Sequence, residues 1–231
     1  MPSMYEIYER HADRYDELVD HEDWEGRLGR FLLSRFGFAG RRVIECGTGT
    51  GRVTALYIGQ AAGALCLDRS AHMLARAQAR LRDHAGKLEF RLRDNADLAG
   101  LGETADLLVE GWSFGHLIVD AEDVEATADA LVRDSLGLLR PGGTAVLIET
   151  LGSGVDAPAA PDPRLDAFYG LLESRHGFAR ETVPTDYRFP DVAAAARAFG
   201  FFFGDAAGEA VRRRGSAVVP EFTGVWHRTL Q

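Results

Sequence analysis

The sequence predicts an α/β protein with a doubly wound, largely parallel sheet, and two observations carry this prediction. Between residues 43 and 150, short apolar segments that suit buried strands alternate with segments of helical periodicity. The first strand, residues 43–46, runs directly into Gly47, Gly49 and Gly51. Glycines after a strand let the backbone turn sharply, and the next helix directs its N-terminal amides at the same place. We therefore expect a small-ligand site at this loop.

Length and composition predict one domain: 231 residues, divided into an N-terminal helical cap (1–36), a ligand-binding core (41–150) and a C-terminal part with cap elements (151–231). The net charge of −9 disfavours nucleic acid, which binds basic surfaces. No leader and no apolar segment of the ~20 residues that span a bilayer is present, so we expect a cytoplasmic protein without membrane contact. The two cysteines fall in predicted strands as small core residues, and no metal site is expected.

The glycine spacing argues against a dinucleotide site. The dinucleotide fingerprint is Gly-x-Gly-x-x-Gly, whereas Gly51 comes one residue early. Glu45 also stands just before the loop, where an acid would repel a pyrophosphate and suit an ammonium or sulfonium group. An NAD(P)-dependent oxidoreductase is therefore a lesser alternative.

The next elements place acids at strand ends. A helix is expected over residues 52–58 and a second strand over 64–68, which ends at Asp68. A carboxylate there can accept hydrogen bonds from both hydroxyls of a ribose. Ser70 would cap the helix that runs to residue 82, and a third strand, 88–92, ends just before Asp94.

The fourth strand, residues 106–110, ends at Glu110 and is followed by Trp112, Ser113 and His116. Ligands of doubly wound sheets bind beyond the carboxyl ends of the strands, so these side chains should lie beside the chemistry. A core position for Trp112 is the alternative. We expect the remaining helices at residues 121–139, 165–175, 191–203 and 205–213, and the remaining strands at 144–150, 182–189 and 221–228.

Three motifs together resemble the class I S-adenosylmethionine-dependent methyltransferases. They are the acid-x-Gly-x-Gly-x-Gly run from Glu45 to Gly51, the Asp-x-Ser-x-x-Met-Leu run from Asp68, and the Leu-x-Pro-Gly-Gly run that ends at Gly143. The resemblance covers roughly residues 5–150 and is strongest to small-molecule enzymes such as the ubiquinone and menaquinone biosynthesis methyltransferases. It implies a Rossmann-like seven-stranded sheet of order 3-2-1-4-5-7-6 with strand 7 antiparallel. Here N-terminal helices precede the sheet, and a helical insertion separates strands 6 and 7.

The resemblance also implies a cofactor site for S-adenosyl-L-methionine. Glu45 would anchor the ammonium network, Asp94 would bind the adenine amino group, and the Asn95 amide would reach a ring nitrogen. Tyr15 belongs to a Tyr-x-x-x-Ala-x-x-Tyr-Asp pattern that begins at Tyr8 and lies over the cleft in similar enzymes. The full set is Tyr15, Glu45, Cys46, Gly47, Thr48, Gly49, Gly51, Asp68, Arg69, Met73, Asp94, Asn95, Glu110 and Trp112. Core packing for Met73 and Tyr8, and helix capping for Asp94, are the structural alternatives.

Methyl transfer from a sulfonium needs little covalent machinery, because the protein mainly aligns the acceptor and excludes water. A hydroxyl acceptor would benefit from a general base, and His116 is the first candidate. Tyr187, Asp186 and Glu149 are weaker candidates, and a structural role is the alternative for each. The four phenylalanines between residues 199 and 203 would either roof an apolar acceptor pocket or pack the insertion itself.

The predicted function is methyl transfer to an O, N, S or C atom of a small molecule by in-line displacement, with no nucleic acid or membrane partner, in a monomer or homodimer. A catalytically inactive protein that binds S-adenosylmethionine as a partner or regulator is the alternative. Methylation of RNA or protein stays open, although the acidic charge disfavours RNA.

Overall fold

The computed structural model describes residues 18–231, which divide into two compact units. The sheet unit comprises residues 29–150, 160–181 and 224–231. The insertion unit comprises, within the described chain, residues 18–28, 151–159 and 182–223.

A seven-stranded sheet of order β3-β2-β1-β4-β5-β9-β6 forms the centre of the fold. Its strands are β1 Arg42–Cys46, β2 Gly63–Asp68, β3 Leu88–Leu92, β4 Ala105–Gly111, β5 Leu139–Ser153, β6 Ala179–Pro184 and β9 Glu221–Thr229. The strands β1 to β5 pair in parallel. The end of β9 lies beside the start of β5, since Thr229 Oγ1 and Thr144 Oγ1 are 2.9 Å apart, so β9 is antiparallel. With β9 as the seventh strand, the predicted order is confirmed.

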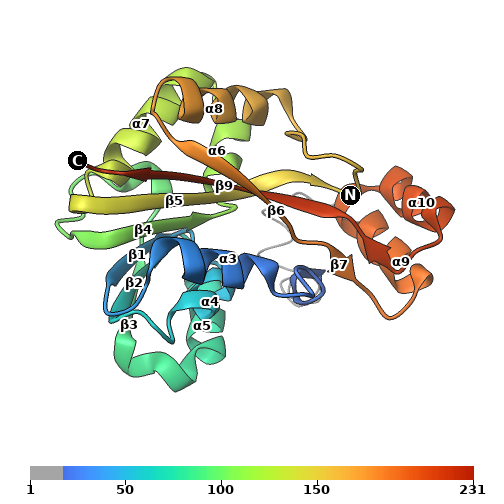
Figure 1. Cartoon of the computed structure of the whole chain (residues 1–231), viewed down its shortest axis with the longest axis horizontal. Coiled ribbons are helices and arrows are strands. Elements are labelled where there is room, and N and C mark those ends of the chain that lie inside the picture. Colours follow the sequence, from blue (N-terminus) through green and yellow to red (C-terminus); the bar gives the residue numbers. More distant parts are fainter. Residues whose placement is uncertain (1–17) are drawn as a thin grey trace. The chain divides into compact units, whose positions relative to one another are not determined.

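Helices cover both faces of the sheet unit (Figure 1). The helices α6 Phe114–Asp120, α7 Val124–Leu136 and α8 Pro163–Ser174 pack on one another on one face, and α3 Arg27–Phe36, α4 Arg52–Tyr57 and α5 Ala71–Arg80 lie on the other. Burial on both faces explains the continuous apolar runs in the strands, and Val43 and Ile44 of β1 are fully buried. No helix within residues 18–231 has the length and apolar character that a bilayer span requires.

Local capping explains where the helices differ from the prediction. Within the expected helical cap, α3 begins at Arg27, because the Asp23 carboxylate accepts hydrogen bonds from the Arg27 and Leu28 amides, at 2.7 and 3.0 Å. The helix expected over 121–139 is α7, which begins after its cap Asp123, and a separate α6 precedes it. β5 is longer than residues 144–150 at both ends.

The strand expected over residues 182–189 is split in two. β6 ends at Pro184, and residues Tyr187–Arg188 form β7, which pairs antiparallel with β8, Val218–Val219, in a separate two-stranded sheet. Between β7 and β8 lie α9 Val192–Phe203 and α10 Asp205–Arg214. The predicted helical insertion between the last two strands of the large sheet is confirmed, and the paired strands β7 and β8 flank its two helices in the sequence.

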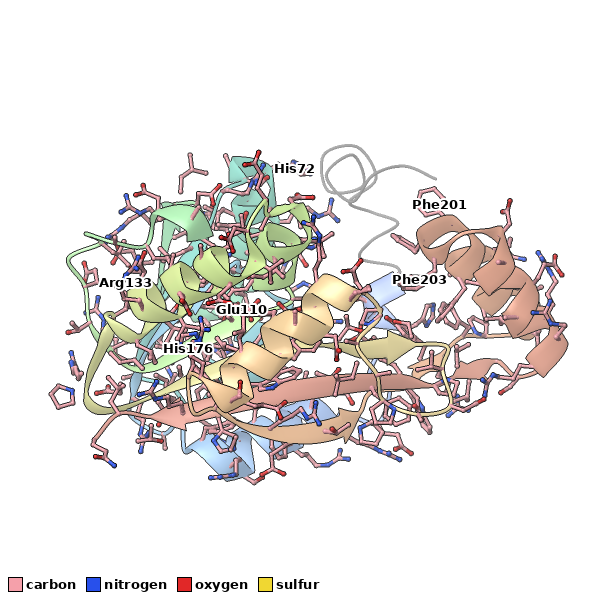
Figure 2. All side chains as sticks on the ribbon, turned by 90° about the horizontal axis from the view of Figure 1, so that it is seen from above. His72, Glu110, Arg133, His176, Phe201 and Phe203 are labelled. Atoms are coloured by element: carbon pink, nitrogen blue, oxygen red, sulfur yellow. The ribbon has the colours of Figure 1, made fainter. Side chains whose placement is uncertain are left out.

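The phenylalanines of α9 pack largely within the insertion unit. Phe199 and Phe202 are 1% and 7% exposed and share a core cluster with Leu18, Tyr187 and Val219. Phe203 is 43% exposed, and Figure 2 labels it with Phe201 on α9. The packing interpretation therefore holds for Phe199 and Phe202.

The contact between α9 and α10 gives a first prediction, because it depends on a glycine. A Cβ at Gly208 would lie 2.7 Å from the Ala196 carbonyl oxygen, so Gly208→Ala must push the two helices apart. In an open helix the same change stabilises by about 0.5–1 kcal/mol. Gly170→Ala on α8, where no atom of residues 18–231 lies within 4 Å of the new Cβ, should show that gain. Chemical denaturation should find opposite signs for the two variants, and a gain in both would contradict the packing argument.

Candidate functional site

The three loop glycines have different structural reasons. All three have positive φ, of 69°, 57° and 80° for Gly47, Gly49 and Gly51. A Cβ at Gly47 would lie 2.2 Å from Ser113 Cβ, and one at Gly51 would lie 2.8 Å from Leu81 Cδ1. Among the described residues, a Cβ at Gly49 would meet only Met73 Cε, at 3.9 Å. Gly47 and Gly51 are thus required by packing, and Gly49 alone leaves open backbone that a ligand can approach.

Asp68 joins the loop to the second strand. Its Oδ2 accepts a hydrogen bond from the Gly49 amide and its Oδ1 accepts one from the Ser70 amide, both at 2.8 Å. Burial raises the pKa of the Asp68 carboxyl, and these two amides oppose that shift. Each carboxylate oxygen retains a second acceptor position. The loop amide of Thr48 donates to the Leu67 carbonyl at 2.9 Å, so the loop is tied to β2 twice.

Glu45 turns toward α4 rather than toward the loop amides. Its carboxylate accepts hydrogen bonds from Thr54 Oγ1, at 2.9 and 3.0 Å to its two oxygens, and from the Tyr57 hydroxyl. The residue is 1% exposed, and burial raises the pKa of its carboxyl to about 7. This geometry ties β1 to the helix after the loop, whereas the sequence predicts a group that anchors a ligand's ammonium network.

The raised pKa of Glu45 gives a second prediction. The folded pKa of about 7 lies above the ordinary value of 4.5, so this group's contribution to stability is complete below about pH 4.5 and is lost as pH rises through about 7. Glu45→Gln keeps an acceptor for Thr54 and Tyr57 and cannot ionise. We expect the variant to gain roughly 1–3 kcal/mol relative to wild type at about pH 8 and to lose that advantage near pH 5. Urea titrations at both pH values would measure this, and a gain independent of pH would contradict it.

The third strand end carries Asp94 and Asn95. Asp94 caps the short turn η2, Asn95–Asp97, by accepting a hydrogen bond from the Ala96 amide at 2.9 Å, which confirms the capping interpretation. Its other oxygen lies 3.8 Å from Arg69 NH1. Asn95 Nδ2 donates to Ser113 Oγ at 3.1 Å, whereas its Oδ1 is buried and accepts no hydrogen bond from the described residues. An orphaned buried acceptor beside the glycine loop suits a ligand that brings a donor.

Ser113 joins three strand ends into one network. Besides Asn95, its hydroxyl contacts Cys46 O of β1 at 3.2 Å and Glu110 Oε1 of β4 at 2.9 Å. Glu110, labelled in Figure 2, is fully buried. The Cys46 and Cys66 thiols are also buried and unbonded to each other, and burial raises the pKa of both. Because this network holds Ser113 in place, its side chain leaves no room for a Cβ at residue 47, which has to be glycine.

Trp112 has a backbone conformation that sequence reasoning missed. Its φ is +52°, which is rare for a bulky residue, and its amide donates to the Ile148 carbonyl at 2.8 Å. The Arg52 guanidinium lies 4.0 Å from the indole ring centroid. Arg52 follows the glycine loop directly, and that position is the only sequence signal that could have pointed to it.

His116 is positioned by α6, in a part of the sheet unit that also carries Glu110. Burial lowers the pKa of its imidazole, and Arg69 acts in the same direction while Asp120 opposes it. The ring is therefore neutral at neutral pH, as a proton acceptor requires. The preceding residue, Gly115, donates its amide hydrogen to Glu149 Oε1 at 2.7 Å.

The two remaining catalytic candidates belong to the insertion unit. Tyr187 is 3% exposed, its hydroxyl donates to Glu22 Oε2 at 3.2 Å, and its ring packs against Phe189 and Phe199. Asp186 Oδ1 accepts a hydrogen bond from the Glu221 amide at 3.1 Å. Both side chains thus have structural partners in their own unit, and their catalytic role stays a prediction. Tyr15 and Tyr8 lie outside the described residues.

The residues of the sheet unit fit S-adenosylmethionine at three places. Gly49 offers open backbone, Asp68 has acceptor positions to spare, and Asn95 Oδ1 lacks a donor within the described chain. Met73 is 5% exposed, with its methyl group facing Gly49, so packing and ligand contact are compatible for this residue.

Comparison with known proteins agrees with this geometry. Residues 43–143 match the family model described as a methyltransferase domain. No curated protein sequence matches the chain significantly. Among solved structures, the [4+2]-cyclase SpnF is 18% identical with a TM-score of 0.62, and 97% of this chain and 95% of SpnF are covered.

Two further structures have the same fold. The N-methyltransferase NodS from Bradyrhizobium japonicum, solved with S-adenosyl-L-homocysteine, is 16% identical with a TM-score of 0.54, and 96% of this chain and 87% of NodS are covered. PH1948 from Pyrococcus horikoshii, provisionally named an RNA methyltransferase, is 13% identical with a TM-score of 0.56, and 87% of this chain and 81% of PH1948 are covered. The methyltransferase domain match covers residues 43–143, which include the glycine loop, and the order of the sheet agrees with it.

Proposed function

We propose that the chain transfers the methyl group of S-adenosylmethionine to a small-molecule acceptor by in-line displacement. The observation that carries the proposal is the pairing of Gly49, the one loop glycine with open space, with Asp68, whose carboxylate binds the Gly49 amide. A neutral, half-buried imidazole at His116 lies on the helix that follows the fourth strand. Together these supply a ligand cradle and a proton acceptor.

The chain's own groups have distinct tasks in this proposal. When bound, the cofactor supplies an electrophilic sulfonium methyl group. Asp68 accepts hydrogen bonds from the ribose hydroxyls, Gly49 lets the backbone approach the ligand, and Asn95 Oδ1 accepts a hydrogen bond from it. For a hydroxyl acceptor, His116 takes the proton as the oxygen–methyl bond forms. Neither a metal nor a covalent enzyme intermediate is required.

A small acceptor is favoured over RNA by charge. The net charge of −9 opposes binding to a phosphate backbone, which requires basic residues for counterion release. NodS, a protein of this fold solved with S-adenosylhomocysteine, is described as an N-methyltransferase. This description supports methyl transfer but does not specify the acceptor of this chain. The acceptor atom is left to experiment.

Calorimetry and methyl-group labelling test the proposal. S-adenosylhomocysteine should bind, and NADH should not, in calorimetric titrations of the full chain. Labelled S-adenosylmethionine is then incubated with a metabolite extract and, in parallel, with total RNA. Label in the small-molecule fraction supports the proposal, and label in RNA alone overturns its acceptor class.

A second candidate is binding of S-adenosylmethionine without methyl transfer. It is favoured by the match to SpnF, which has this fold and is described as a [4+2]-cyclase. This second candidate predicts saturable binding in the calorimetric titrations and no label in any fraction of the labelling experiment.

The proposed base gives a third prediction. His116→Gln removes the proton acceptor while keeping a polar side chain of similar length, so kcat for a hydroxyl acceptor should fall about 100-fold. S-adenosylhomocysteine affinity should stay within about twofold of wild type, because the imidazole is not assigned to the cofactor. Steady-state kinetics and calorimetry measure the two effects, and an unchanged kcat would remove His116 from the mechanism.

A further inference from the structure

Two buried carboxyl groups lie next to the proposed site without a cationic partner. Glu110 is 0% exposed at the end of β4, and Glu149 is 3% exposed in the neighbouring strand β5. Within the described residues, no arginine, lysine or histidine forms an ion pair with either carboxyl. A buried carboxylate without a counter-charge is costly, so this arrangement requires a reason.

The reason is visible at the start of α6. Glu110 Oε1 accepts hydrogen bonds from the Ser113 and Phe114 amides at 2.6 and 3.0 Å, and Glu149 Oε1 accepts one from the Gly115 amide at 2.7 Å. Ser113 is the N-cap residue but makes no capping bond with its own side chain. The two glutamates therefore satisfy the free amides of the first turn, which capping residues normally do.

Close packing shows that the arrangement is specific. A Cβ at Gly115 would lie 2.9 Å from Glu149 Oε2, so only glycine leaves room for this carboxyl group. The next residue in the helix is His116. Any movement of the first turn of α6 would carry the imidazole with it.

The pair accommodates one negative charge more readily than two. Glu110 Oε2 is buried and has no hydrogen-bond partner among the described residues, and the two carboxyls are close enough for Glu110 to raise the pKa of the Glu149 carboxyl. A proton held between the carboxyls satisfies that oxygen. The titratable groups that face the pair are the Cys46 thiol from β1 and the Tyr169 phenol from α8. Burial raises the pKa of both, so neither supplies charge near neutrality.

We propose that Glu110 and Glu149 share one proton and act as positioning residues that hold the first turn of α6, and with it His116, in place. The inference rests on the proposed function only in the task that it gives His116. When the shared proton passes to solvent base, two like charges face each other at one helix terminus, and the turn loosens. Burial raises the pKa of both carboxyls, and the charge of Glu110 raises that of Glu149 further, so loosening belongs to the alkaline side.

Amide hydrogen exchange tests this without any ligand. In the full wild-type chain, protection of the Ser113, Phe114 and Gly115 amides, corrected for intrinsic exchange, should fall at least about tenfold between about pH 7 and pH 9.5. In Glu149→Gln the side-chain oxygen still accepts the Gly115 amide, and its NH2 group donates to Glu110 at every pH. Protection there should change less than about twofold over the same range. Glu110→Gln is the second variant should the first not fold.

The imidazole provides a readout that a purely structural role would not move. In the wild-type chain, the NMR signals of the His116 ring should shift over the same pH range in which the first-turn amides of α6 lose protection. In Glu149→Gln these ring signals should stay constant. Glu125→Gln on α7, where the side chain is 61% exposed, is the matched control and should behave as wild type. Equal pH dependence in wild type and Glu149→Gln, or full protection throughout, would overturn the shared proton. Failure of S-adenosylhomocysteine to bind would instead overturn the proposed function and leave this result standing.

Discussion

Asp68→Ala should reduce the affinity for S-adenosylhomocysteine by at least about 100-fold, because the change removes two kinds of interaction at once. The carboxylate orders the loop by accepting the Gly49 and Ser70 amides, and it is the group expected to bind the ribose hydroxyls. Hydrogen bonds to a charged acceptor contribute about 1.5–3 kcal/mol each, so the loss of two is large. Isothermal titration calorimetry at constant pH measures the change.

The control for Asp68 is an acid of the same unit without such contacts. Asp83→Ala removes a side chain that is 89% exposed and should leave the affinity within about twofold of wild type. Circular dichroism should show that both variants keep the fold. Asp68→Ala with wild-type affinity would mean that the ligand does not use the end of the second strand, and the site as assigned would be wrong.

Gly47→Ala should destabilise the sheet unit by about 3–5 kcal/mol. A left-handed backbone costs an L-residue about 1–2 kcal/mol, and the new Cβ would also overlap Ser113 Cβ at 2.2 Å. Ser113 cannot withdraw freely, since its hydroxyl contacts Asn95, Cys46 and Glu110. Urea denaturation of the variant measures the loss of unfolding free energy.

Substitutions at two other glycines separate the effect of backbone strain from those of steric overlap and of ligand binding. Gly40→Ala, at φ +70° with no described atom within 4 Å of the new Cβ, should show the backbone strain alone, about 1–2 kcal/mol. Gly49→Ala should cost a similar amount, because its Cβ meets only Met73 Cε at 3.9 Å, and it should weaken S-adenosylhomocysteine binding. If Gly47→Ala were no more destabilising than Gly40→Ala, the close approach to Ser113 would not limit the fold.

Local signals explain which parts of the site could be predicted from the sequence. The strand, glycine loop and helix are contiguous, and Ser70 and Asp94 cap turns within three residues of themselves. Strand order followed from the resemblance, and the periodicity of residues 191–203 and 205–213 located α9 and α10. The split after Pro184 was missed, because a pairing between Tyr187 and Val219 leaves no local mark on either segment.

The sequence by itself determined the fold class, the loop and the acids at the strand ends, because each depends on neighbours along the chain. Only the tertiary structure decided what those groups contact. It turned Glu45 toward Thr54 and Tyr57 and placed Ser113 against Gly47, where it leaves no room for a Cβ. It also gave Trp112 a positive φ, with its indole ring against the Arg52 guanidinium. It also brought Glu110 and Glu149 together beneath α6. The physical reason is that hydrogen bonds, steric overlap and shared protons act over a few ångströms in space, between residues that the sequence holds far apart.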